Sequence, residues 1–517
     1  MLELHWFKGF ALCFILSFSL GAETPLPEQM QKIMQKEKYR HANWGVYAKD
    51  SVTGEVLYDD HSQQLFLPGS TTKIFTVAAL LHAYGDDYRF ETPVYAAGPI
   101  QQGTLQGDLV LVGMGDFTLG GRQSEGSDAI AYTTMDHIYA NYVPGATLTP
   151  QDPLNGLNQL ALMIREKGIK EINGKIVIDD DLFDKTEKRE MFLTPIIIND
   201  NLIDLLFQPA EEGKIASLTW RPMVEGYTVK NEVKTVAKDG KLDIQISSDK
   251  SGRNIVVTGT LPVDQKNILR TFSIKDPKSF AQAAFMTALK QAGISLNLKA
   301  EGQTALSEPT SWREKKPIAV WMSPPLSEYA KLILKVSHNF GADLIPLLLA
   351  VKTGKRTFEE GMTELGKFVT GIVKVPPDSF VFLDGAGGDQ NRLTPQAEVQ
   401  LLEYVKGLPA EQFKKFTQAL PILGLDGNLA DVSKDSIAVG KVYAKPGTGI
   451  SLNAATGQFF LTTQALAGYI EGQNGHLIEF SIAVNNGEMP KIEDIFPIFD
   501  DFGQMTVIMY ERSKIKK

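Results

Sequence analysis

The stretch FLPGSTTKIFTVAALL, residues 66–81, joins a turn signal to a strongly apolar helix pattern. Pro68-Gly69 predicts a turn, and the residues that follow predict a buried helix from Ser70 to about Ala83. A helix start would place the Ser70 hydroxyl and N–H at the positive end of the helix dipole. Lys73 follows three residues later on the same face, so its amine can reach the Ser70 hydroxyl. This pattern predicts a serine nucleophile paired with a lysine.

The Ser-x-x-Lys pattern by itself is weak evidence, because it also occurs at Ser247 and Ser513. Ser247 lies in a polar turn and Ser513 lies in the basic tail, where no lysine can be buried. The simpler alternative is that Ser70 only caps a helix and Lys73 is a solvated first-turn residue. The apolar helix favours the chemical interpretation.

Two further short motifs supply what a serine–lysine pair needs, namely Ser337-His338-Asn339 and Lys445-Pro446-Gly447-Thr448. A serine hydroxyl is a poor nucleophile and requires a neighbouring base. A lysine serves as that base only if burial and a second cation lower its pKa, and Lys445 is a candidate for the second cation. The alternative is that Lys445 is an ordinary strand lysine.

The remaining motif residues have expected roles around the reacting carbonyl. Ser337 would relay a proton to the leaving amine, and Asn339 would hold the substrate amide and the lysine. The backbone N–H groups of Ser70 and Thr448, with Gly447 beside them, would form an oxyanion hole worth roughly 3–4 kcal/mol per donor. The alternative is that Ser337 and Asn339 merely join two helices.

Composition excludes several other function classes. The 517-residue chain has a net charge of −9 and no long basic run, so nucleic-acid binding is not expected. It has one cysteine, Cys13, and seven scattered histidines, without zinc-ligand spacing. Asp179-Asp180-Asp181 fits no calcium loop and indicates a solvated turn. No serine lies in a nucleophile elbow. We therefore expect neither a metal nor an organic cofactor.

The N-terminus has the pattern of an export signal, residues 1–22. Lys8 supplies a positive charge, Gly9–Leu20 is a 12-residue apolar run, and Gly21-Ala22 offers small residues for cleavage. The run is too short to span a membrane, although an uncleaved N-terminal anchor is the alternative. Removal of Cys13 with the signal would suit an oxidising compartment outside the cytosol, and we expect the mature chain to be soluble. The basic residues 512–517 predict at most peripheral membrane contact, with a solvated tail as the preferred interpretation.

The order of helix-like and strand-like segments along the sequence predicts one catalytic core interrupted by a long insertion. The expected domains are 23–85 for the first part of the core, 86–316 for a β-rich insertion that divides into two domains, and 317–517 for the second part. The core opens with a hairpin, 43–48 and 54–58 around a turn at 49–53. The remaining expected strands are 93–96, 108–112, 175–178, 217–221, 227–229, 254–258, 439–444, 457–463 and 478–485, and the expected helices are 157–167, 279–292, 326–336 and 340–351.

The three motifs together resemble those of penicillin-binding proteins and class A β-lactamases. The long gap from Ser70 to Ser337 resembles the D-alanyl-D-alanine carboxypeptidase/endopeptidase family of class C low-molecular-mass penicillin-binding proteins, serine peptidase family S13. Collinear stretches support this resemblance: 66–81, GDLVLVGMGDFTLGG (107–121), GIKEINGKIVIDDDLF (168–183), VVTGTLPVD (256–264), SPPLSEYAKLILKVSHNFGADL (323–344), LDGAGGDQNRLTP (383–395), LDGNLA (425–430) and ALAGYIEGQNGHLIEFSIAVNN (465–486).

The resemblance implies a penicillin-binding-protein/β-lactamase-like α/β (α+β) transpeptidase fold with a large β-rich insertion between the first two motifs. It also implies a serine DD-peptidase that is exported to the periplasm. Such an enzyme cleaves peptidoglycan stem peptides or cross-links through an acyl-serine and is acylated by penicillins.

The chain departs from the family pattern at three positions. The usual Lys-Thr-Gly has Pro446 in place of threonine, which removes a hydroxyl and a backbone donor. A literal Lys352-Thr353-Gly354 exists, but its context predicts a helix C-cap. His338 and Ala386 stand where many relatives carry Asp and Ser. The alternatives are therefore a non-catalytic cell-wall binding homologue, or a β-lactamase or esterase on the same scaffold. Carboxypeptidase and endopeptidase action are not distinguished.

Overall fold

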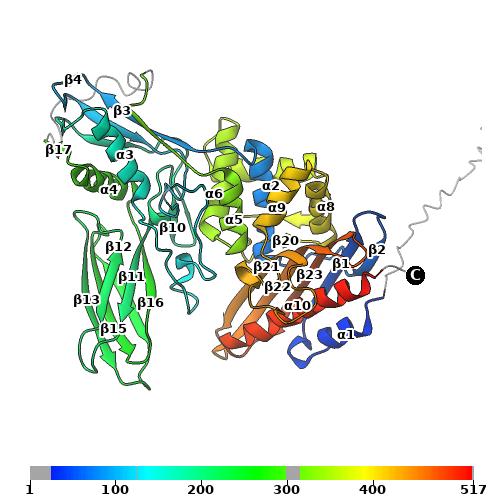
Figure 1. The fold of residues 1–517 in the computed structure, drawn as a ribbon. Helices are drawn as coiled ribbons and strands as arrows, with labels where there is room; N and C mark the ends of the chain where they lie inside the picture. Colours follow the sequence, from blue (N-terminus) through cyan, green and yellow to red (C-terminus); the bar gives the residue numbers. More distant parts are fainter. Residues whose placement is uncertain (1–24, 125, 298–314, 515–517) are drawn as a thin grey trace, which may run out of the picture.

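The computed structural model describes residues 25–124, 126–297 and 315–514. The expected signal segment and the last three residues of the basic tail lie outside the described residues. The chain forms a core of one sheet with helices, and a β-rich region that extends from it (Figure 1). Residues before and after the β-rich region together build the core.

The centre of the core is a five-stranded antiparallel sheet in the order β2-β1-β23-β22-β21. The expected hairpin at the start of the core is confirmed, since β1 pairs with β2. β1 also pairs with β23, which joins the two ends of the core. β2 and β21 are the edge strands. The bounds are β1 Asn43–Asp50, β2 Val56–Asp60, β21 Val442–Asn453, β22 Gln458–Glu471 and β23 Leu477–Glu488.

Helices cover both faces of this sheet. α1 (Glu28–Met34) and α10 (Ile495–Arg512) pack on one face, with Trp44 stacked on Phe502 at 5.5 Å between ring centroids. α8 (Pro395–Lys406) packs against the other face. Beyond it lie α2 Thr72–Tyr84, α5 Leu326–Lys335, α6 Asn339–Lys352, α7 Phe358–Lys367 and α9 Ala410–Ala419.

The apolar helix predicted after Pro68-Gly69 is a largely buried element of the core. A single 3₁₀ turn, Gly69–Thr71, leads into α2. Residues 71–80 are all buried, as expected for a helix that is apolar on every side. Ser70 therefore lies in the 3₁₀ turn, and the α-helical part begins two residues later than predicted.

The β-rich region has a hydrophobic core of its own, made by residues between Val94 and Trp321. Its strands form the sheets β18-β3-β6-β8, β17-β7-β5-β4, β12-β11-β16 and β13-β15-β14. The second of these consists of two-residue strands, β4 Ile100–Gln101, β5 Thr104–Leu105, β7 Glu171–Ile172 and β17 Ser295–Leu296. The main bounds are β3 Glu91–Ala97, β6 Asp108–Val112, β8 Ile176–Asp179, β11 Leu202–Gln208, β12 Ser217–Arg221, β13 Thr228–Val236, β14 Asp243–Ser248, β15 Asn254–Pro262, β16 Ile268–Ser273, β18 Ala319–Met322, α3 Asn155–Glu166 and α4 Pro277–Gln291.

The β-rich region also packs against the helices of the core. Phe183, Met191 and Leu193 belong to the same hydrophobic cluster as the α6 side chains. The hairpin of β9 (Thr186–Lys188) and β10 (Met191–Leu193) reaches α6 (Figure 1). The division at residues 85/86 and 316/317 stays a prediction. β18, which follows residue 316, pairs with β3 inside the inserted sheet.

Candidate active site

The three predicted motifs meet at one cavity of about 250 Å³. They come from the 3₁₀ turn before α2, from the junction of α5 and α6, and from β21. The cavity is lined by Ser70, Ser337, Asn339, Lys445 and Thr448, together with Met135, Tyr139, Val143, Val336, Asn428, Pro446, Ile450 and Phe499. Lys73 lies beneath this surface, and Gly447 packs against the turn that carries Ser70.

Lys73 is fully buried, and its amine lies 2.7 Å from Ser70 Oγ. It donates to Asn339 Oδ1 at 2.7 Å and to the Ala386 carbonyl at 2.8 Å. Both of those atoms are acceptors only, so a neutral amine would spend its two N–H bonds on them. Its lone pair would then face the Ser70 hydroxyl, the arrangement that a general base requires.

The electrostatic surroundings favour the neutral amine. Burial and, as the smaller effect, the Arg189 cation lower the pKa of Lys73 to about 7, against the opposing carboxylates of Asp343 and Asp384. Burial and the neighbouring Lys73 also hold the pKa of Lys445 well below its usual range. The cation that lowers the pKa of Lys73 is thus Arg189, which no sequence motif marked. The expected role of Lys445 as the second cation stays a prediction.

Ser337 occupies the turn between α5 and α6 in a strained backbone conformation, with φ of +63°. Its Oγ lies 3.3 Å from Lys73 Nζ, and its carbonyl accepts a hydrogen bond from the Tyr139 hydroxyl. Tyr139 comes from the inserted region. The neighbouring His338 is buried and accepts the Gly341 N–H on Nδ1 at 3.1 Å, so it caps α6.

Gly447 permits β21 to lie directly against the turn that carries Ser70. A Cβ at position 447 would overlap the Pro68 carbonyl and come within 2.9 Å of the Ser70 nitrogen. On the opposing side, Gly69 has φ of +54°, and a Cβ there would lie 3.1 Å from the Thr448 nitrogen. These two glycines bring the Ser70 and Thr448 amides close together, as an oxyanion hole needs.

Pro446 lies on the edge strand, where a missing N–H is tolerated. The Ala444 N–H on the same strand donates to Pro421 and therefore points away from β22. Backbone alternation places the nitrogens of residues 446 and 448 on that same open side. The proline thus removes no hydrogen bond from the sheet. Its carbonyl accepts from Lys445 Nζ at 2.7 Å.

The literal Lys352-Thr353-Gly354 is confirmed as a helix end. α6 ends at Lys352, Thr353 is its C-cap, and Gly354 has φ of +73°.

Four side chains near the site were missed: Tyr139, Arg189, Asp343 and Asp384. Asp384 lies in LDGAGG, part of a stretch that supports the family resemblance, so the sequence offered a reason to include it among the site residues. Arg189 lies in KTEKRE, a charged run that looks like any solvated turn. Its contact with the core depends on the tertiary structure.

Within the described residues, no group of three or more His, Cys, Asp or Glu side chains is arranged to hold a metal ion. Asp180 and Asp181 of the acidic run form ion pairs with Lys278 and Arg356.

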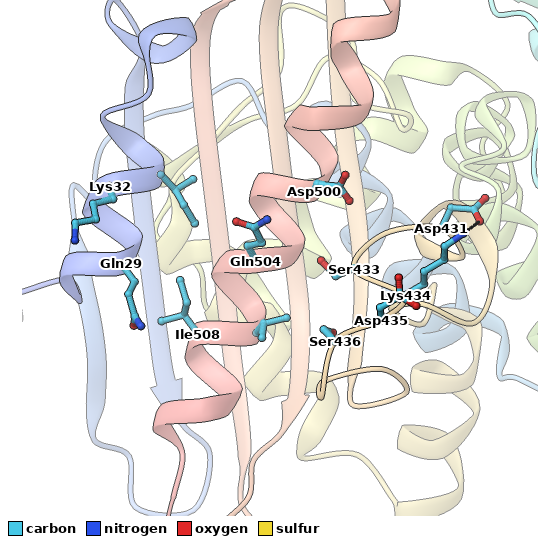
Figure 2. Close-up of a pocket in the computed structure, with 12 residues that line it drawn as sticks. Gln29, Lys32, Asp431, Ser433, Lys434, Asp435, Ser436, Asp500, Gln504 and Ile508 are labelled. Carbon is cyan, nitrogen blue, oxygen red and sulfur yellow. Dashed lines mark ion pairs between the residues drawn. The ribbon is translucent and has the colours of Figure 1, made fainter.

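A larger cavity, about 740 Å³, lies between α1, α10 and residues 431–436 (Figure 2). Its wall carries charged groups of both signs, including Lys32, Asp435 and Asp500, and Asp431 pairs with Lys434 at 3.9 Å. None of the three motifs lines it.

A sequence model of the D-Ala-D-Ala carboxypeptidase 3 (S13) family matches residues 26–499. The chain belongs to this serine peptidase family. The resemblance predicted from the motifs is thus confirmed over nearly the whole chain.

Two relatives show the degree of sequence similarity to named proteins. The D-alanyl-D-alanine carboxypeptidase of Actinomadura sp. (strain R39) is 27% identical over 494 residues, covering 90% of this chain and 81% of the relative. A D-alanyl-D-alanine carboxypeptidase of Haemophilus influenzae is 24% identical over 436 residues, covering 81% of each.

The fold also matches that of a solved structure. The crystal structure of penicillin-binding protein 4 from Haemophilus influenzae superposes with a TM-score of 0.69 at 21% identity, covering 93% of this chain and 99% of that one. The expected penicillin-binding-protein fold is confirmed. Among the residues that the structure describes, no helix is both long and apolar enough to cross a membrane.

Proposed function

We propose that this S13 enzyme is an exported serine DD-peptidase that works through an acyl-serine intermediate and is acylated by penicillins. The observation that carries the proposal is the Lys73 amine, buried 2.7 Å from Ser70 Oγ with its N–H bonds directed to Asn339 and the Ala386 carbonyl. The substrates would be peptidoglycan stem peptides or cross-links. The carboxypeptidase relatives are named for action on D-alanyl-D-alanine.

In the acylation step, Lys73 takes the Ser70 proton while Oγ attacks the carbonyl between two D-alanines. The Ser70 and Thr448 amides stabilise the developing oxyanion. The proton passes through Ser337 to the nitrogen of the departing D-alanine, so the C–N bond breaks as the ester forms. Water then hydrolyses the ester and regenerates Ser70.

Substrate binding falls to Asn339, Lys445 and Thr448 in this proposal. Asn339 holds the substrate amide, and the Lys445 amine positions the terminal carboxylate. The usual threonine hydroxyl is lost at Pro446, but the Thr448 hydroxyl lies two residues along the same strand face and donates to Gln464 at 2.8 Å.

Export would place the enzyme in the periplasm through the segment 1–22, with at most peripheral membrane contact through the basic C-terminus. Mass determination of the secreted protein tests this: the proposal predicts an N-terminus just after residue 22. A protein that keeps Met1 would contradict it.

The activity is tested by incubating the protein with an N-acylated tripeptide ending in D-Ala-D-Ala and with a cross-linked muropeptide dimer. We expect D-alanine release or dimer cleavage by the native protein and none by Ser70→Ala. Binding to peptidoglycan without any cleavage would support the non-catalytic alternative. Penicillin hydrolysis that is faster than peptide cleavage would support a β-lactamase.

A further inference from the structure

The β9–β10 hairpin of the inserted region directs a cation toward the back of the active site. Its two-residue turn is Arg189-Glu190, with φ of +50° and +61°. Such turns favour Asn-Gly, because other residues pay roughly 1–2 kcal/mol each for this conformation. Arg189 and Glu190 are both unfavourable in this turn, which points to another role for at least one of the two side chains.

Arg189 bridges two carboxylates of the core. Its Nε donates to Asp343 at 3.0 Å and its Nη2 donates to Asp384 at 3.0 Å. Asp343 lies on α6, one turn after Asn339, and is only 1% exposed. The Arg189 side chain is 32% exposed to solvent, so its ion pairs are partly shielded.

The two carboxylates hold the loop that contacts the base. Asp384 accepts the N–H groups of residues 386, 387 and 388, and Asp343 accepts the Gly385 N–H at 3.1 Å. This loop presents the Ala386 carbonyl to Lys73 Nζ. Arg189 is therefore connected to Lys73 through two ion pairs and one backbone loop.

The charges that face Lys73 come from four elements: Asp343 on α6, Asp384 on the loop, Lys445 on β21 and Arg189 on the hairpin. Burial and the Arg189 cation lower the pKa of Lys73, and the two carboxylates raise it. Without Arg189, both carboxylates would stabilise a proton on the amine that has to accept one from Ser70.

We propose that Arg189 is a positioning residue of the reaction, which neutralises Asp343 and Asp384 so that Lys73 is held as a base and the Ala386 loop stays in place. The inserted region thereby contributes a residue to the catalytic step. This inference rests on the proposed peptidase function, but the amine can also be measured directly.

The test compares Arg189→Asn with Arg189→Gln, Arg189→Lys and the control Glu190→Gly. Asparagine suits the turn but lacks the charge, whereas glutamine removes the charge with a longer side chain. Lysine keeps the charge. Glu190→Gly relieves the same backbone strain at the neighbouring position and leaves the cation in place.

The first readout is the ¹⁵Nζ titration of Lys73 in ¹⁵N-lysine-labelled protein, assigned by its absence in Lys73→Arg. We expect the midpoint to rise by at least one pH unit in Arg189→Asn and Arg189→Gln, to rise less in Arg189→Lys, and to stay unchanged in Glu190→Gly. An unchanged midpoint in the two neutral variants would overturn the inference, and one folded neutral variant is sufficient for that decision.

The second readout is the rate of Ser70 acylation by a penicillin from pH 6 to pH 10. The neutral variants should be at least about fivefold slower near pH 7, where the native amine is half deprotonated, and about tenfold slower at pH 6. They should approach the native rate at high pH, because both amines are deprotonated there. A deficit that is equal at every pH would indicate a merely structural role and would overturn the inference. If the native protein is not acylated at all, the proposed function fails, and the ¹⁵Nζ midpoint alone decides the role of Arg189.

Discussion

At the scale of single residues, the site depends on contacts that leave little freedom for substitution. Gly447 is the clearest case, because a Cβ there would meet the Pro68 carbonyl and the Ser70 amide. We expect Gly447→Ala to slow penicillin acylation at least 100-fold, since the two oxyanion donors must move apart. Gly366→Ala is the matched control, because a Cβ at that position would meet no atom within 4 Å. Equal acylation rates for the two variants would contradict this geometry.

Pro446 is a residue whose replacement should improve the enzyme. Threonine at this position would restore an N–H at the open edge of β21 and place a hydroxyl on the strand face that carries Thr448, without disturbing the sheet. We expect Pro446→Thr to raise kcat/KM for a D-Ala-D-Ala peptide about tenfold, as one added hydrogen bond to a carboxylate provides. Pro446→Ala restores only the N–H and should gain less. A loss of activity in Pro446→Thr would mean that the cleft is adapted to proline.

At the scale of elements, the junction of α5 and α6 is held from the inserted region. His338 stacks on Phe117 at 5.6 Å between ring centroids, and its Nε2 lies 3.5 Å from Asp200 Oδ1. Arg122 pairs with Asp136 at 2.6 Å and with Asp200 at 2.9 Å in the same buried cluster. The turn that carries Ser337 therefore sits on an ionic network from a different part of the chain.

This support predicts a positional defect when His338 is removed. His338→Ala loses the α6 cap, worth about 1 kcal/mol, and loosens Ser337 and Asn339. We expect the acylation rate to fall about tenfold at every pH. The pH at which the rate begins to rise should not shift, because the charges around Lys73 remain. His82→Ala serves as the control, because it also removes a histidine side chain, one that forms a hydrogen bond with Tyr404 Oη at 2.9 Å. A pH-dependent deficit would contradict this assignment.

Sequence patterns predicted elements and motifs well where the signal was local. Ser70 and Lys73 share one helix turn, and the strands at 108–112 and 217–221 match β6 and β12. Tyr139 and Arg189 were missed because each lies in a polar segment whose contact with the core is made only in three dimensions. The strand at 227–229 was predicted too short because β13 continues through the alternating polar residues up to Val236.

At the scale of the whole molecule, buried carboxyl groups make stability depend on pH. Burial raises the pKa of Glu398 from 4.5 to about 7, although Thr71 and Ser481 donate to it. Burial also raises the pKa of Glu479 to about 7. The folded state then binds more protons than the unfolded state between pH 4.5 and 7, so the free energy of unfolding falls as pH rises through this range.

Glu398→Gln tests that dependence. Glutamine keeps an acceptor for Ser481 but cannot ionise. We expect the variant to be more stable than the native protein at pH 8, by on the order of 2 kcal/mol, and nearly equal to it at pH 5. Chemical denaturation at the two pH values measures the difference. A native protein whose stability rises from pH 5 to pH 8 relative to the variant would contradict the assignment.

The catalytic cycle as a whole depends on Ser70 as an acylated nucleophile. Intact mass spectrometry of the mature protein after incubation with a penicillin tests this most directly, with Ser70→Ala as control. We predict a lasting one-to-one adduct on the native protein and none on the variant. A folded native protein that forms no adduct, or an adduct that persists in Ser70→Ala, would contradict this role of Ser70.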